Sequence, residues 1–179
     1  AEMALRRGVS LIVASPAAKV EPEYEDDVMY ALDGSLLSLS DAKLAALPSF
    51  LAKRHRGRPI LEFVASIDCS VNRISNIENM CEFTRLTKFI ASHNKLEATA
   101  FDGMPIFPTL DTLSLNHNNI VDVGHFVPNL AKIFPNLKSL SILYNPGVPN
   151  PMNDENKDKY QQHRYYMISR LPKLENLDS

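Results

Sequence analysis

The chain has 179 residues, of which 45% are hydrophobic and 22% charged, and its formal net charge at pH 7 is -2. A chain of this size and composition can bury one continuous core, which excludes a sequence too polar to collapse. The near balance of charge excludes the cationic excess that draws proteins onto nucleic acid or anionic membranes, and we expect neither as a direct partner.

The first 35 residues match no repeated pattern. Residues 9–18 form an apolar run that loosely resembles the hydrophobic part of a secretion signal, but it is far shorter than the roughly 20 residues of a membrane-spanning helix. We favour the alternative of an edge strand or extended segment packed on the domain. Residues 21–27 are strongly acidic and are expected to form a solvated loop. Residues 1–35 are therefore assigned to an N-terminal segment with a possible edge strand or cap, and we expect no membrane span.

A repeat runs through the middle of the chain. Four copies follow the pattern Leu-x-x-Leu-x-Leu-x-x-Asn, with other apolar residues at some of the Leu positions, and they end at Asn72, Asn94, Asn118 and Asn145. A weaker first copy has Ala42 in place of the asparagine, and the five positions are separated by 30, 22, 24 and 27 residues. This period is typical of leucine-rich repeats. The pattern predicts an α/β solenoid of about five repeats over residues 36–156, with a parallel concave sheet and a helical or irregular convex side.

The repeated asparagines are expected to be structural. Each lies where the chain turns off a strand, and its amide can bond to backbone groups of neighbouring turns. A buried polar group left unpaired costs roughly 1–3 kcal/mol. We therefore expect these side chains to hold the turns together.

The connections between strands favour helical turns at residues 49–55 and 122–133, and a recurrent Phe-Pro-x-Leu at residues 107–110 and 134–137 returns the chain to the next strand. Residues 157–170 carry Tyr160, Arg164, Met167 and Ile168 at helical spacing. One further strand begins after Leu171 and stops. Because a solenoid must cover its terminal repeats, residues 157–179 are predicted to form a C-terminal cap.

The cap residues 165–178, Tyr-Tyr-Met-Ile-Ser-Arg-Leu-Pro-Lys-Leu-Glu-Asn-Leu-Asp, resemble those of the short leucine-rich-repeat proteins with an A-prime-type cap. That group includes the A-prime protein of a spliceosomal particle and an axonemal dynein light chain. The similarity spans about residues 36–178, and no individual binding residue carries over. Residues 47–54, 140–146 and 150–164 favour a branch of the group that implies adaptor work in vesicle and pigment-organelle trafficking with a Rab-type small GTPase. The alternative is a structural ribonucleoprotein component that resembles the spliceosomal A-prime protein.

The concave face of the predicted sheet is the candidate site. Outward-facing side chains of a solenoid sheet are ordered by the strands and are free of the core. Small serines on this face leave room for a bulky element of a partner, such as a helix. The alternative is a solvated serine-lined face with no partner. The candidate partner-binding residues are Asp68, Lys88, Ile90, His93, Asn116, His117, Leu143 and Tyr144.

Catalytic and metal-binding patterns are weak in this sequence. His93 and His117 fall in one column near Asp68, but no good third or fourth metal ligand is aimed at the same point. The two histidines could instead sense pH or bond to a partner. The chain has no phosphate-binding loop and no nucleophile elbow. We expect no enzyme, no metal and no cofactor.

The sequence also contains two cysteines and one basic cluster. Cys69 lies at an inward core position and Cys81 is expected to be packed, and so few cysteines favour a reducing compartment. We expect a cytoplasmic monomer, or a nuclear protein if the ribonucleoprotein alternative holds. Residues 53–58 hold four cations in six positions. This cluster could contact an acidic partner or phospholipid headgroups, but we favour a solvated convex turn.

Overall fold

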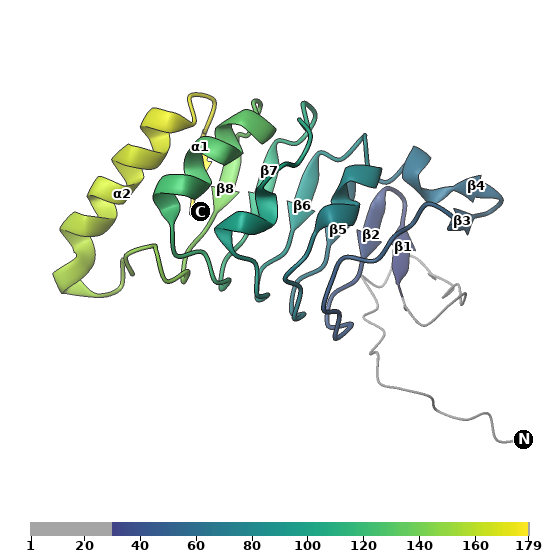
Figure 1. Cartoon of the computed structure of the whole chain (residues 1–179), viewed down its shortest axis with the longest axis horizontal. Coiled ribbons are helices and arrows are strands. Elements are labelled where there is room, and N and C mark those ends of the chain that lie inside the picture. Colours follow the sequence, from purple (N-terminus) through teal and green to yellow (C-terminus); the bar gives the residue numbers. More distant parts are fainter. Residues whose placement is uncertain (1–29, 179) are drawn as a thin grey trace, which may run out of the picture.

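The computed structural model describes residues 30–178. The apolar run at residues 9–18 and the acidic stretch at residues 21–27 lie outside the described residues. The main sheet contains β1 (Ala31–Asp33), β2 (Leu36–Ser38), β5 (Ser66–Asp68), β6 (Lys88–Ile90), β7 (Thr112–Ser114), β8 (Ser139–Ser141) and β9 (Asn176–Leu177). Figure 1 shows these strands side by side along the molecule, with β1 and β2 at one end and the last helix at the other.

The sheet has the order expected of a solenoid. Its strands follow one another as β1-β2-β5-β6-β7-β8-β9, and every pair is parallel except β1 with β2. One buried apolar side chain of each strand lies in register with the next, so these residues form a continuous row. The row contains Leu37, Ile67, Phe89, Leu113, Leu140 and Leu177. The predicted leucine-rich-repeat fold with its parallel sheet is confirmed.

The connections are mostly short and helical. The 3-10 helices are η1 (Ile60–Glu62), η2 (Glu78–Glu82), η3 (Ala98–Phe101) and η4 (Asp154–Asn156). Helix α1 (Val123–Ile133) confirms the helical turn predicted at residues 122–133. Asp122 is its N-cap, because its carboxylate accepts the His125 N–H at 2.9 Å.

The helical turn predicted at residues 49–55 is wrong. Strands β3 (Arg54–His55) and β4 (Arg58–Pro59) instead form a separate antiparallel hairpin. The turn between them is Arg56-Gly57, and both residues have positive φ, 50° and 79°, as a two-residue hairpin turn requires. The segment before the hairpin is bonded to η2, because the Glu82 carboxylate accepts the Ser49 hydroxyl at 2.5 Å and the Phe50 N–H at 2.7 Å.

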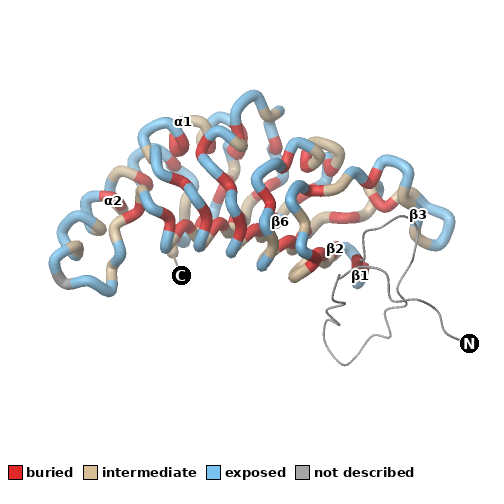
Figure 2. Tube along the Cα trace, turned by 60° about the horizontal axis from the view of Figure 1, so that its bottom comes forward, coloured by how far each residue is buried: buried red, intermediate tan, exposed pale blue. Residues whose placement is uncertain are grey.

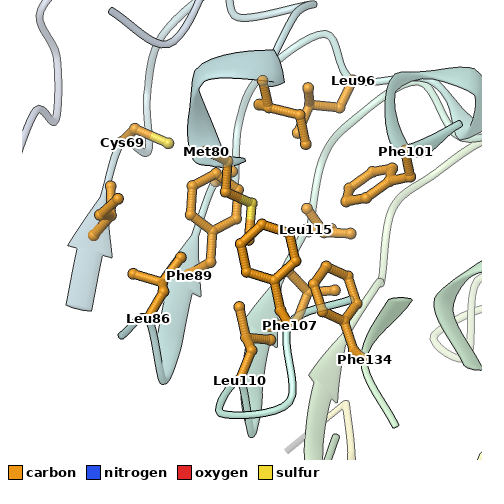
Figure 3. Close-up of a cluster of buried hydrophobic side chains, with 14 of the residues drawn as sticks. Cys69, Met80, Leu86, Phe89, Leu96, Phe101, Phe107, Leu110, Leu115 and Phe134 are labelled. Carbon is orange, nitrogen blue, oxygen red and sulfur yellow. The ribbon is translucent and has the colours of Figure 1, made fainter. Parts of the chain in front are cut away.

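The core lies between the sheet and the convex connections. Figure 2 shows buried positions recurring along successive turns, with exposed positions on the outer loops. Aromatic rings fill the convex side, where Phe101 meets Phe126 at 5.3 Å and Phe107 meets Phe134 at 5.7 Å between ring centroids. Figure 3 shows Leu115 within this cluster. Cys69 is fully buried as expected, and burial raises the pKa of its thiol, so the group remains neutral.

The asparagine ladder has the predicted structural role. Asn118 donates from Nδ2 to the carbonyls of Ala91 and Leu115 at 2.9 and 3.0 Å, and its Oδ1 accepts the Leu96 N–H at 2.9 Å. The same three bonds recur at each asparagine. Two of them join its turn to the preceding turn, and the third stays within its own turn. The other members are Asn72, Asn94 and Asn145.

The last repeat is closed by helix α2 (Lys157–Arg170) and strand β9, as the sequence predicted. In earlier repeats the N–H just after the strand donates to a carbonyl of the next strand, as Leu115 does to Ser141 at 2.7 Å. After β8 the Asp178 carboxylate takes that role, because its Oδ1 accepts the Ile142 N–H at 2.8 Å. Its Oδ2 accepts the Tyr160 hydroxyl at 2.8 Å, which anchors α2 to the end of the sheet.

The cap contains a buried histidine. His163 is buried on α2, and its Nε2 has no hydrogen-bond partner among the described residues. Burial lowers the pKa of His163, and the nearby Asp178 carboxylate opposes this shift. The folded protein therefore favours the neutral imidazole over the imidazolium.

This histidine predicts a loss of stability in acid. The pKa of His163 is lower in the folded than in the unfolded state, where it is about 6.5. The preference of the fold for the neutral side chain therefore contributes fully to stability at pH values above about 6.5. The contribution declines as the pH falls below that value. We expect melting temperature to fall between pH 7 and pH 5 less steeply in His163→Leu than in the wild type. An equal fall in melting temperature in the two proteins over this pH range would contradict the prediction.

Candidate partner-binding surface

A column of stacked rings lies at the carboxyl ends of three neighbouring strands. His93, His117 and Tyr144 each lie three residues beyond the end of their strand, β6, β7 and β8 respectively. The His93 and His117 rings are 4.2 Å apart at an interplanar angle of 15°, and the His117 and Tyr144 rings are 4.3 Å apart at 14°. All three side chains are exposed, and we call this group the ring stack.

The backbone sets the spacing of the ring stack. The three residues have left-handed conformations with φ of 56°, 54° and 60°, which few residues other than glycine adopt. The His93 N–H donates to the Asn116 carbonyl at 2.8 Å, and the His117 N–H donates to the Leu143 carbonyl at 2.9 Å. Each ring is therefore held one strand spacing from the next before any partner arrives.

The central ring of the stack favours its neutral form. Desolvation lowers the pKa of His117, and the neighbouring His93 lowers it further. A neutral His117 imidazole stacks between the other two rings without placing a charge between them. The stack therefore presents flat ring surfaces with polar ring nitrogens along them.

The remaining predicted site residues line the adjacent strands. Asp68 and Ile90 lie in register with Ser114 across β5, β6 and β7, and all three are half-buried. The Asp68 carboxylate accepts the Ser70 N–H at 3.0 Å and the Ser70 hydroxyl at 2.5 Å. Lys88 is exposed at the start of β6. This part of the face is small, polar and internally bonded.

Asn116 and Leu143 lie directly before the rings of His117 and Tyr144. Both residues are half-buried. The Oδ1 atom of Asn116 is buried and has no hydrogen-bond donor in the described part of the chain. Leu143 adds an aliphatic side chain beside the Tyr144 ring. The C-terminal part of the surface is therefore the more apolar one, whereas its N-terminal part is rich in serine.

The histidine pair is not arranged as a metal site. Within residues 30–178, no group of three or more His, Cys, Asp or Glu side chains is placed to hold a metal ion. The His93 and His117 rings lie nearly parallel at 4.2 Å, so they face each other through their flat surfaces. Two imidazole ligands of one metal would instead direct a nitrogen of each ring at a common point.

The column positions were predictable, but the ring stack was not identified from the sequence. His93, His117 and Tyr144 occupy the same position of consecutive repeats, and that coincidence is the signal that would have revealed it. The bonding of Ser92 to Ser114, 2.9 Å between hydroxyl oxygens, was also missed. Small hydroxyl side chains on neighbouring strands are close enough to bond to each other rather than only to solvent.

The parallel sheet, the asparagine ladder and the exposed column at the strand ends define a leucine-rich-repeat protein. No known family model matches the chain. Over 118 residues, 63% of the chain, it is 33% identical to the human leucine-rich melanocyte differentiation-associated protein, of which the match covers 59%. It is 32% identical over 113 residues to the U2 small nuclear ribonucleoprotein A' of Schizosaccharomyces pombe, and 34% identical over 112 residues to a probable U2 small nuclear ribonucleoprotein A' of Caenorhabditis elegans.

The fold agrees with these relatives. A chain in the crystal structure of the Drosophila melanogaster SNF/U2A' complex superposes with a TM-score of 0.54 at 22% identity, which covers 89% of this chain and 78% of that one. The chain therefore has the leucine-rich-repeat fold, and its sequence is similar to that of A' proteins. It spans 59%, 42% and 40% of the lengths of the three curated relatives. None of the helices in residues 30–178 is long and apolar enough to cross a bilayer.

Proposed function

We propose that the chain is a non-catalytic adaptor that binds a partner protein on the concave side and strand ends of its sheet. The observation that carries the proposal is the ring stack, which is exposed and already ordered. Exposed aromatic side chains that are fixed before binding lose little conformational entropy when a partner covers them. Such residues are frequent hot spots of protein interfaces. The proposed contact residues are Asp68, Lys88, Ile90, His93, Asn116, His117, Leu143 and Tyr144.

The shape of the surface supports a helix or another bulky element as the bound part of the partner. Serines occupy much of the N-terminal side and leave space above the strands, whereas Leu143 and Tyr144 provide apolar anchors at the other side. Tyr144 is 43% exposed, so part of its side chain is available to a partner. An amphipathic helix that buries its apolar face against these anchors fits this pattern.

For the class of partner we propose a Rab-type small GTPase or associated trafficking machinery, in the cytoplasm. This finer proposal is supported by the similarity to the leucine-rich melanocyte differentiation-associated protein and by the adaptor role that the resemblance implies. The second candidate is a structural component of a nuclear ribonucleoprotein. It is supported by the similarity to U2 small nuclear ribonucleoprotein A' proteins from several organisms.

A pulldown from cell lysate, with a GTP analogue and GDP in parallel, distinguishes the two classes. The bait proteins are the wild type, the double variant Leu143→Ala with Tyr144→Ala, and the control Ile106→Ala. Ile106 is 66% exposed, but it lies on the connection between η3 and β7 and outside the proposed surface.

Recovery of a small GTPase only with the analogue is expected, reduced in the double variant and unchanged in the control. Recovery of spliceosomal proteins with both nucleotides, again lost in the double variant, would favour the ribonucleoprotein candidate. Equal recovery by all three baits would contradict the proposed surface.

A further inference from the structure

The β3–β4 hairpin is the most cationic surface feature of the described chain. Arg54, Arg56 and Arg58 are all exposed within this short hairpin, which projects at the end of the solenoid where β1 and β2 lie (Figure 1). Arg58 lies 3.4 Å from the Glu62 carboxylate, but both side chains are more than half exposed and such a pair is weak. Arg54 and Arg56 have no carboxylate partner among residues 30–178.

An apolar hollow lies beside the hairpin. Its volume is about 320 Å³, and its walls include Tyr30, Phe50, Leu51 and Lys53. The Tyr30 and Phe50 rings meet edge to face at 5.4 Å, while Leu51 is 68% exposed. Lys53 directly precedes β3, so the hollow and the cationic hairpin form one continuous surface. This surface combines an apolar depression with a basic rim.

We propose that this surface binds the acidic stretch of the same chain at residues 21–27. That stretch, Glu-Pro-Glu-Tyr-Glu-Asp-Asp, contains five carboxylates in seven residues with Tyr24 at its centre. Its charge is complementary to the arginines of the hairpin, and its tyrosine is complementary to the apolar hollow. Guanidinium groups are well suited to carboxylates because they can donate two parallel hydrogen bonds.

The chain connection brings the two surfaces together. Asp27 lies only three residues before Tyr30, which is itself a wall of the hollow. Three extended residues span at most about 10 Å, so the chain tethers Asp27 within that distance of Tyr30. A segment tethered this closely has an effective concentration in the millimolar range. Contacts that would be weak between separate molecules are then sufficient for docking.

The docked stretch acts as a counterpart of the C-terminal cap. A solenoid exposes an apolar face at each end unless another segment covers it. Helix α2 covers the last repeat, and the acidic stretch covers the hollow beside the first. Its carboxylates also offset the positive charge of the hairpin arginines. This role is independent of the ring stack and of the proposed adaptor function.

A zero-length carbodiimide crosslink in the full chain tests the proposal. The reagent joins a carboxylate to an amine only when the two are in contact, so Arg56→Lys places an amine on the hairpin without changing its charge. The matched control is Arg170→Lys, an exposed arginine on α2 at the other end of the solenoid. A second control combines Arg56→Lys with the neutral substitutions Glu21→Gln, Glu23→Gln, Glu25→Gln, Asp26→Asn and Asp27→Asn.

Mass spectrometry of the monomer is expected to show an intramolecular crosslink between position 56 and residues 21–27. Its yield should fall several-fold at about 0.5 M salt, where exposed charges are screened. It should be absent from both controls. A yield no greater than that of Arg170→Lys would overturn the proposal, as would crosslinks that form only between two copies of the chain or only to carboxylates elsewhere.

Discussion

Leu115→Ala is expected to lower the free energy of unfolding by about 2–5 kcal/mol, because it leaves a cavity in the core. Leu115 is fully buried directly after β7, within the aromatic cluster shown in Figure 3. The large rings around it are held by their own contacts and cannot easily move into the space. Urea denaturation of the wild type and the variant measures this loss.

Tyr144→Ala is the matched comparison for that experiment. Tyr144 is 43% exposed, and its removal opens no cavity in the core. We expect its unfolding midpoint to remain close to that of the wild type. Equal losses of stability in Leu115→Ala and Tyr144→Ala would contradict the separation of core and surface residues that underlies the proposed function.

Asn118→Ala is expected to destabilise the protein by a comparable amount. The substitution removes the three ladder hydrogen bonds of Asn118. The N–H of Leu96 then lacks its acceptor, and the carbonyl of Ala91 lacks one of its donors. Each buried group left unpaired costs roughly 1–3 kcal/mol. The effect should be visible as a lower unfolding midpoint in urea.

Two further variants show whether the asparagine amide itself is responsible. Asn118→Asp keeps the shape of the side chain but replaces the donor with an oxygen that faces the carbonyls of Ala91 and Leu115, so it should be at least as destabilising. Asn119→Ala changes the adjacent exposed asparagine and should have little effect. A small loss in Asn118→Ala, similar to that in Asn119→Ala, would show that the ladder contributes little to stability.

The repeated part of the fold was predictable because each turn depends on contacts between equivalent positions. An apolar residue in each strand and an asparagine at each turn, such as Phe89 with Asn94, are sufficient to align a strand and its turn with the neighbouring repeat. The C-terminal cap was also predictable, because residues 157–170 have helical spacing and are followed by one incomplete repeat.

The N-terminal end was harder to predict because it does not repeat. β1 pairs antiparallel with β2 through a turn at Gly34-Ser35. The sequence pattern predicts a possible edge strand of this N-terminal segment at residues 9–18 and none at residues 31–33, where β1 lies. The β3–β4 hairpin was mistaken for a helical turn. In both cases a two-residue turn containing glycine, Gly34-Ser35 or Arg56-Gly57, was the available signal. Such a turn is only weak evidence for a hairpin when the flanking strands are two or three residues long.

The candidate surface was predictable as a set of columns but not as a set of contacts. The repeat period places His93, His117 and Tyr144 at equivalent positions. It does not fix how their rings are oriented, because that depends on the left-handed backbone at each position and on the strand spacing. The lowered pKa of His117 also depends on this packing, because it follows first from desolvation of the ring and then from the neighbouring His93.

If the ring stack binds a partner protein, the affinity of a recovered partner must depend on Tyr144. Titration calorimetry of that partner against the wild type, Tyr144→Ala and Ile106→Ala should be accompanied by the melting temperature of each protein. Loss of a hot-spot contact of about 2 kcal/mol should weaken binding by Tyr144→Ala roughly 30-fold, with little change in its melting temperature and with Ile106→Ala unaffected. Unchanged affinity in Tyr144→Ala, or an equal loss of affinity in Ile106→Ala, would show that the ring stack is not the binding surface.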